Sequence, residues 1–291
     1  VREGKRQRAL NPLRPGDRDL MLAVRHRLEI AANHIPRQPH EGEGFGDGDF
    51  AGAFDGWAEA LRFDPMRIGA LKGIAFLYFR AGDVPAALEH LHRERPDIVI
   101  LNGDMTESGH ALTQVADFAA AARGRLATAA VLGNWEYRAG VVGSVAGDVY
   151  RRVGVELLVN RSITVNVGGA RLALVGLDDI LMGRPDLTKA RTGIAAGVTE
   201  IWLVHEPAFA TAPPVGVSAR PIVLLSGHTH GGQIRIPLLP PVKPEGAGRF
   251  LEGWYRDTFA PLYVSRGVGT TGIPARFRCP AELPIFTLRA A

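Results

Sequence analysis

Cysteine is nearly absent from the sequence, since Cys279 is the single one among 291 residues. One cysteine can neither form a disulfide within the chain nor build a cysteine-based zinc cluster, so an oxidised scaffold is excluded. Long apolar runs are missing as well: no stretch approaches the roughly 18 residues of a membrane span, and none has the pattern of a signal peptide. We therefore expect a soluble protein of a reducing compartment, the cytoplasm.

Extremes of composition are also lacking. Hydrophobic residues make up 46% of the chain and charged residues 22%, which is ordinary for a globular protein with a substantial core. The net charge of +4 lies within residues 1–29, where eight basic side chains face four acidic ones. Such an arm is either a solvated tail or a contact to nucleic acid or anionic lipid. Because no nucleic-acid-binding motif is present, we expect no specific nucleic-acid partner and keep peripheral membrane contact open.

Composition divides the chain in two. Residues 1–64 hold the basic arm, a stretch with helical spacing at 20–32, and a run at 41–57 whose glycine and aspartate content is typical of a linker. From residue 65 to residue 291, short apolar runs alternate with helical or loop segments. This alternation predicts one α/β domain.

Four apolar runs of this domain each end in polar residues of the kinds that bind metals. In α/β sheets, sites form beyond the carboxyl ends of strands, where loops converge on a rigid frame. The runs and the residues that follow them are 98–101 with Asn102-Gly103-Asp104, 129–132 with Gly133-Asn134-Trp135-Glu136, 201–204 with His205, and 222–225 with Ser226-Gly227-His228-Thr229-His230. We expect these strand ends to meet at one edge.

His228 and His230 carry the strongest local signal. Their spacing of two places both imidazoles on one side of an extended segment, whereas a lone strand-end Asp104, Asn134 or His205 is more often a turn, cap or structural residue. Together the five side chains offer a carboxylate, an amide oxygen and three imidazoles. This set suits a divalent transition ion such as Mn²⁺, Fe²⁺, Zn²⁺ or Co²⁺ better than Ca²⁺ or Mg²⁺.

Four motifs occur together: Gly103-Asp104, GNWE at 133–136, the strand-end His205, and GHTHGGQ at 227–233. In this combination the chain resembles the calcineurin-like metallophosphoesterase family, over roughly residues 66–289. The stretch 263–289 and the pair Asp178-Asp179 are similar to the bacterial branch of that family. The resemblance implies an α/β fold, a four-layer α/β/β/α sandwich of two mixed sheets flanked by helices.

The resemblance also implies a hydrolase in which two metal ions activate a water to cleave a phosphomonoester or a phosphodiester. Asp104 would bridge the two ions. Asn134, His205 and His228 would complete the shell of the second ion, and His230 would bind the first.

Two sites depart from the family pattern. Gly73 and Ala75 stand where the family has the Asp-x-His ligands of the first metal, and Trp135 stands where it has the histidine that protonates the leaving group or steadies the phosphate. Asp83 or Lys72 is open as a substitute, and a misread reading frame would produce the same loss. We expect one divalent ion held firmly and a second ion weakly or not at all.

Three functions stay open on these grounds. The first is a metal-dependent phosphoesterase acting on a small-molecule or lipid-type phosphate ester. The alternative is a catalytically weak or inactive relative that keeps the fold and one metal site as a metal-binding, phosphate-binding or regulatory module. Nucleic-acid binding through the basic arm is the third. Arg266 and Arg276 suit either a phosphate contact or a surface ion pair.

Overall fold

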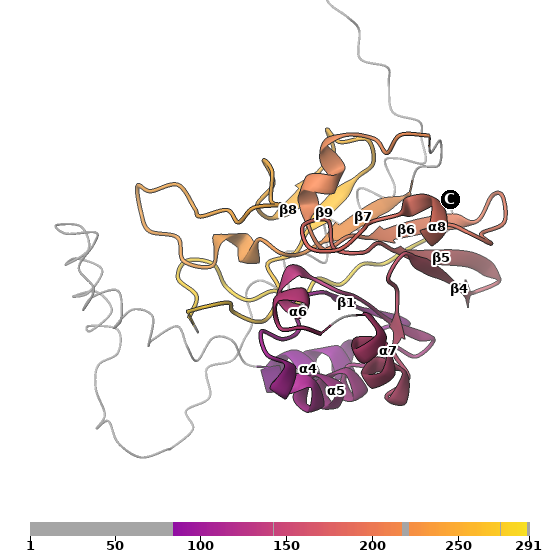
Figure 1. The fold of residues 1–291 in the computed structure, drawn as a ribbon, viewed down its shortest axis with the longest axis horizontal. Helices are drawn as coiled ribbons and strands as arrows, with labels where there is room; N and C mark the ends of the chain where they lie inside the picture. Colours follow the sequence, from indigo (N-terminus) through magenta and orange to yellow (C-terminus); the bar gives the residue numbers. More distant parts are fainter. Residues whose placement is uncertain (1–83, 142, 217–220, 274, 290–291) are drawn as a thin grey trace, which may run out of the picture. The chain divides into compact units, whose positions relative to one another are not determined.

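The computed structural model describes residues 84–141, 143–216, 221–273 and 275–289 (Figure 1). The helices and strands of these residues lie in one compact unit that ends at Leu283. The predicted domain boundary at residue 65, the linker and the two positions of the lost first-metal ligands lie outside the described residues, as do Lys72 and Asp83.

Within the described part of the chain, three strands form the smaller sheet, paired in parallel in the order β1-β2-β3. Its side chains alternate between two faces, as the period of two in a strand requires. Val99 and Leu101 pack beneath helices, whereas Ile98 and Ile100 face the larger sheet. The strands are β1 Ile98–Asn102, β2 Ala127–Val131 and β3 Glu156–Leu157. The helices over its outer face are α4 Val84–Glu94, α5 Leu112–Ala121 and α7 Gly143–Arg152 (Figure 1).

Six strands form the larger sheet, in the order β4-β5-β6-β7-β9-β8, with an antiparallel pair at each edge and parallel pairs between them. The β4–β5 hairpin turns at Gly168 and Gly169, whose φ angles of 55° and 86° suit the left-handed positions of a two-residue turn. The strands are β4 Arg161–Val167, β5 Ala170–Gly176, β6 Thr199–Leu203, β7 Val223–Ser226, β8 Gly253–Tyr255 and β9 Leu262–Val264.

An apolar layer joins the two sheets. Val131 of the smaller sheet meets Leu174 and Leu203 of the larger one there. On the outer face of the larger sheet, the fully buried Trp202 packs in a second cluster with Leu187. The elements that cover this face are α8 Leu187–Ala190 and the 3-10 turn η2 Pro207–Thr211. The predicted four-layer sandwich of two sheets flanked by helices is therefore confirmed.

The strands that carry the predicted ligands end at one edge of this sandwich. β1 and β2 run in parallel, as do β6 and β7. Hydrogen bonds join the ends of the two sheets: Nδ2 of Asn102 donates to the carbonyl of Leu225 at 3.2 Å, and the carbonyl of Asn102 lies 2.6 Å from Nδ1 of His205. We call this the ligand edge.

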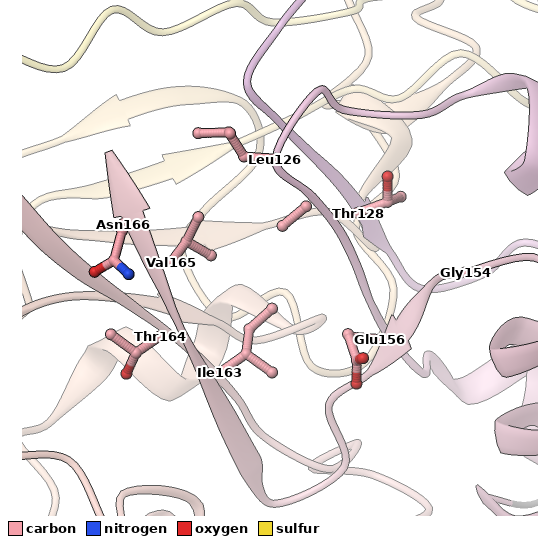
Figure 2. Close-up of a pocket in the computed structure, with 9 residues that line it drawn as sticks. Leu126, Thr128, Gly154, Glu156, Ile163, Thr164, Val165 and Asn166 are labelled. Atoms are coloured by element: carbon pink, nitrogen blue, oxygen red, sulfur yellow. The ribbon is translucent and has the colours of Figure 1, made fainter. Parts of the chain in front are cut away.

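An open pocket of about 440 Å³ lies at the other end of β2, between β2, β3 and β4 (Figure 2). Thr128, Ile163 and Val165 are among its lining residues. β2 is 5 residues long and runs from this pocket toward Asn134, where α6 Asn134–Arg138 begins. None of the five predicted ligands, all of which the structure describes, lines the pocket. The predicted ligands therefore lie at the ligand edge and not in this pocket.

Candidate metal centre

Asp104, His205 and His228 form a buried cluster at the ligand edge. One ligand atom of each lies within 4.8 Å of the others. His205 is 2% exposed and His228 is 8% exposed, and their ring centroids lie 5.1 Å apart. Because the three residues follow β1, β6 and β7, the cluster joins the edges of both sheets.

Two glycines allow the loops to approach this closely. A Cβ at Gly103 would stand 2.4 Å from Nδ1 of His205, and a Cβ at Gly133 would stand 2.4 Å from Oδ1 of Asp104. Both distances are far shorter than van der Waals contact. Gly103 also has a φ of 82°, in the left-handed region that favours glycine.

Glu136 ties the first two loops together. Its carboxylate accepts hydrogen bonds from the backbone N–H groups of Asp104, Met105 and Gly133. The residue is 2% exposed, and burial together with the charge of Asp104 raises the pKa of its carboxyl. The sequence pattern alone assigned this residue no role, because its contact with Asp104 joins positions 32 residues apart.

Asp104 and His205 form a buried ion pair, with 3.0 Å between Oδ2 and Nε2. Burial lowers the pKa of the imidazole, but the adjacent carboxylate outweighs this effect and raises that pKa to about 10. For Asp104 burial acts in the opposite direction and raises the pKa. The charge of His205 opposes burial and brings the pKa of Asp104 below its ordinary value of 3.8. A divalent cation bound here would take the place of the imidazole proton, because it supplies the positive charge beside Asp104.

Each histidine of the cluster uses one ring nitrogen for a backbone carbonyl. Nδ1 of His205 lies 2.6 Å from the carbonyl oxygen of Asn102, and Nε2 of His228 lies 2.5 Å from that of Glu245. An N–H donated at these positions fixes the tautomer and turns the other nitrogen toward the site. Metal-binding histidines have this arrangement almost always. The residues present therefore fit a metal ion.

Asn134 and His230 lie beside the cluster. Asn134 is 5% exposed, and among the described residues its Oδ1 has no hydrogen-bond partner, nor does Nδ1 of His230. Burial and the charge of Arg276 lower the pKa of His230 to about 4, which leaves its ring neutral, as a ligand must be. His230 stands outside the group that closes within 4.8 Å. The structure thus brings three predicted ligands together and places a buried, unpaired polar atom of each of the other two at the same edge.

Asp179 and Glu206 form a second buried group beside His205. Both are 0% exposed, and Glu206 follows His205 directly. Two backbone N–H groups donate to Oδ1 of Asp179, and that of Ile180 donates to Oε2 of Glu206 at 3.1 Å. Burial and a hydrogen bond with Asp179 raise the pKa of Glu206 to about 8. Sequence patterns gave Glu206 no signal beyond its place next to His205.

Arg266 and Arg276 differ in their surroundings. Arg266 forms ion pairs with Glu252 and Glu282, at 3.5 Å and 3.2 Å. Arg276 is 1% exposed and donates to main-chain carbonyls, including that of His230 at 3.1 Å. The sequence-based alternatives of a surface ion pair or a phosphate contact are therefore wrong for Arg276, because it is buried and backbone oxygens take its donors.

A family model described as calcineurin-like phosphoesterase matches residues 77–232. The chain belongs to this family. The match covers β1, β2, β6, β7 and all five predicted ligands, and it begins after Gly73 and Ala75. The loss of the Asp-x-His pair stays a prediction.

Relatives of this chain occur in bacteria and animals. It is 28% identical over 228 residues to the uncharacterized metallophosphoesterase YkuE of Bacillus subtilis (strain 168), covering 73% of this chain and 75% of the relative. It is 26% identical over 199 residues to the phosphodiesterase YaeI of Escherichia coli (strain K12), covering 67% and 71%. A transmembrane protein with metallophosphoesterase domain of Bos taurus is 33% identical over 216 residues, covering 67% of this chain and 46% of the relative. Within the ranges that the structure describes, no helix is both long and apolar enough to cross a membrane.

In this chain an indole, that of Trp135, follows Asn134 at the edge of the site. The backbone N–H of Trp135 donates to Oδ1 of Asp104 at 3.0 Å, and the guanidinium of Arg138 lies 5.0 Å from the centroid of the indole. An indole N–H donates a hydrogen bond but has no acid chemistry at neutral pH. The GNWE motif therefore still binds Asp104 through the backbone N–H of Trp135, whereas the Trp135 side chain offers no proton.

Proposed function

We propose that this chain is a metal-dependent phosphoesterase that hydrolyses a phosphomonoester or a phosphodiester. One observation carries the proposal: Asp104, His205 and His228 present ligand atoms within 4.8 Å of one another. Two of these atoms are ring nitrogens aimed by carbonyl contacts on the far side of each imidazole. Membership of a phosphoesterase family supports the same reading.

The residues proposed to hold the metal are Asp104, Asn134, His205, His228 and His230. Their donor set favours Mn²⁺, Fe²⁺, Zn²⁺ or Co²⁺. A bound divalent ion supplies two things here, a coordinated water of lowered pKa and a positive charge beside the phosphoryl oxygens. The chain's own part is to hold the site rigid: Glu136 fixes the loops of Asp104 and Asn134, and the carbonyls of Asn102 and Glu245 fix the two imidazoles.

We further propose that one ion binds firmly and a second weakly or not at all, since the side chains of Gly73 and Ala75 offer no ligand atom where the family has two. The substrate is a small-molecule or lipid-type phosphate ester, and the similarity to the Escherichia coli phosphodiesterase YaeI favours a phosphodiester. Cytoplasmic location with peripheral membrane contact through residues 1–29 belongs to the same proposal, as does the lack of a specific nucleic-acid partner.

A second candidate rests on Trp135. Without a histidine in the motif, no group there protonates the leaving group, and such a group contributes typically 10²–10⁴-fold to rate. The alternative function is therefore a metal-binding or phosphate-binding regulatory module with little turnover.

The test is metal binding and hydrolysis by the purified full chain. Metal content after dialysis against Mn²⁺ is measured for the wild type, for His228→Ala, and for His92→Ala as a control on the exposed surface. Hydrolysis of an aryl phosphate and of a bis-aryl phosphate is then followed. We expect the wild type and His92→Ala to retain metal and hydrolyse at least one ester, and His228→Ala to lose both properties. Retained metal without hydrolysis would favour the binding module, and no metal in the wild type would refute both.

A further inference from the structure

The segment that carries His228 and His230 has an unusual backbone. His228, His230 and Gln233 have φ angles of 67°, 49° and 45°, and the two glycines between them are left-handed too. A non-glycine residue adopts this region only when its surroundings hold it there. The direction of the His230 imidazole therefore depends on whatever fixes the backbone of the turn η3 His230–Gly232.

Arg276 is the group that holds it. This side chain is 1% exposed, and its Nη1 donates to the carbonyl of His230 at 3.1 Å. Its other bonds go to carbonyls of the carboxyl-terminal segment, at Arg266 (2.6 Å), Gly267 (3.2 Å), Gly269 (2.9 and 2.5 Å) and Cys279 (3.4 Å). A guanidinium has five N–H donors in a rigid planar fork, which a lysine ammonium cannot reproduce. Arg276 thus fastens the turn of His230 to the segment 266–279.

Neighbouring contacts strengthen the same attachment. The Sγ of Cys279 lies 3.2 Å from the carbonyl of His230 and 3.3 Å from that of Gly231, and Nε of Arg235 donates to Gly231 at 2.7 Å. Gln233 exchanges hydrogen bonds with the backbone of Thr271. Of the charged side chains that contact this turn, that of Arg276 is almost fully buried.

We propose that Arg276 is a positioning residue of the metal centre, which sets the direction of the His230 imidazole by binding the His230 carbonyl. The inference rests on the proposed function in that it takes the centre to bind a metal. It assigns Arg276 no contact with substrate. Nδ1 of His230 is buried and has no hydrogen-bond partner within the described ranges. A hydrogen bond at this ring atom therefore does not orient the imidazole.

The first test is a double-mutant cycle on metal affinity. The dissociation constant for Co²⁺ is measured by competition with a chelating dye for the full chain and for Arg276→Lys, His230→Ala and the double variant. We expect Arg276→Lys to weaken binding by about tenfold or more, as loss of an outer contact to a ligand commonly does. In the His230→Ala background the same change should shift affinity by no more than about twofold. An undiminished effect in that background, or no effect in either, would overturn the inference.

The matched control is Arg191→Lys. Arg191 forms a two-pronged ion pair with Glu200 at 2.9 Å and 2.8 Å, at the start of β6 and away from the ligand edge. This variant loses a guanidinium ion pair whose carboxylate side chain is 7% exposed, without touching the turn of His230. It should bind Co²⁺ as the wild type does, so a general loss of stability is separated from a loss of positioning.

A second measurement needs no metal. The amides of Gly232 and Gln233 donate to the carbonyls of Thr229 and His230 at 2.8 Å and 3.0 Å. Their hydrogen exchange should be faster by about tenfold or more in Arg276→Lys and unchanged in Arg191→Lys. If the wild type binds no Co²⁺ while exchange responds in this way, the proposed function fails and the positioning of the turn by Arg276 stands. If exchange is unchanged, the positioning role fails. If Arg276→Lys does not fold, the same two measurements are made on Arg276→Gln.

Discussion

Gly133 shows how much one residue decides at this site. Its φ of −115° and ψ of 178° are open to any amino acid, so its backbone does not require glycine. The constraint is contact: a Cβ there would stand 2.4 Å from Oδ1 and 2.7 Å from the backbone nitrogen of Asp104. The backbone of Asp104 cannot yield without moving the carboxylate that it carries.

We predict that Gly133→Ala weakens Co²⁺ binding by about tenfold or more, and destabilises the chain by about 1–3 kcal/mol through overpacking. The control is Gly147→Ala within α7, where the added Cβ meets only Leu157 at 4.0 Å. That change should leave metal binding intact and stabilise the helix by roughly 0.5–1 kcal/mol. Metal titration and urea unfolding of both variants check the pair, and equal metal affinities would contradict the contact argument.

At the scale of elements, β6 is tied to the segment after α8 by a carboxylate. The carboxylate of Glu200 accepts a hydrogen bond from Nη2 of Arg191 at 2.8 Å and another from Nε1 of Trp202 at 2.7 Å. Burial raises the pKa of Glu200, but these bonds outweigh it and bring the pKa below its ordinary value of 4.5. Its ionised form therefore stabilises the fold.

Glu200→Gln should lower the free energy of unfolding at pH 7 by about 1–3 kcal/mol, the range for hydrogen bonds to a charged group. Because the folded pKa is lowered, this contribution is complete above the ordinary pKa of 4.5 and is lost as the pH falls through the folded value. The difference between wild type and variant should therefore shrink toward pH 3. Glu156→Gln removes an ion pair whose side chains are 52% and 55% exposed, and it should cost less than about 1 kcal/mol at either pH. Urea unfolding at both pH values decides; a constant difference would refute the linkage.

The elements also show what was readable from the sequence. β1, β2, β6 and β7 were predicted because each is a short apolar run that ends in polar residues, and this signal is local. Glu136, Glu206 and Arg276 were given no correct role, because their partners are set by the tertiary fold. The Arg276 contact with His230 joins positions 46 residues apart, and no local pattern marks it. The strand ends that come together were thus predictable, and the contacts that hold their side chains in place were not.

At the scale of the whole molecule, the metal should act as a bond between the two sheets. Asp104 follows a strand of the smaller sheet, whereas His205 and His228 follow strands of the larger one. A ligand that binds only the folded state stabilises it by about 2.7 kcal/mol at one hundred times its dissociation constant.

For a domain of this size, that free energy corresponds to a rise in Tm of roughly 5–10 °C. We predict such a rise when Mn²⁺ is added to the chelator-treated protein, and none in His205→Ala. Calorimetry with and without a chelator measures it. A wild-type Tm that does not respond to saturating metal would show that the cluster does not bind the ion in the folded state.

The first-metal ligands give the last prediction. If their loss limits the enzyme, Gly73→Asp together with Ala75→His should add one equivalent of metal and raise turnover of an aryl phosphate by about tenfold or more, equal to about 1.4 kcal/mol of barrier. Trp135→His should then add rate without adding metal, because it restores an acid rather than a ligand. Elemental analysis and steady-state rates check both steps. A second ion without faster turnover would favour the binding module.

The order of the strands decides when β7 can pair with its neighbours in the nascent chain. β7, which delivers His228, lies between β6 and β9, and β9 is made only when synthesis has passed Leu262–Val264. Arg276 emerges later still. On the ribosome, the chain therefore exposes an unpaired edge of β7 until β9 has been made, and the carbonyl of His230 lacks its contact with Arg276 until that residue has been made. Any metal binding at this site should therefore follow the synthesis of β9, because a truncated chain ending before β9 would carry Asp104, His205 and His228 yet lack the strand that pairs with β7.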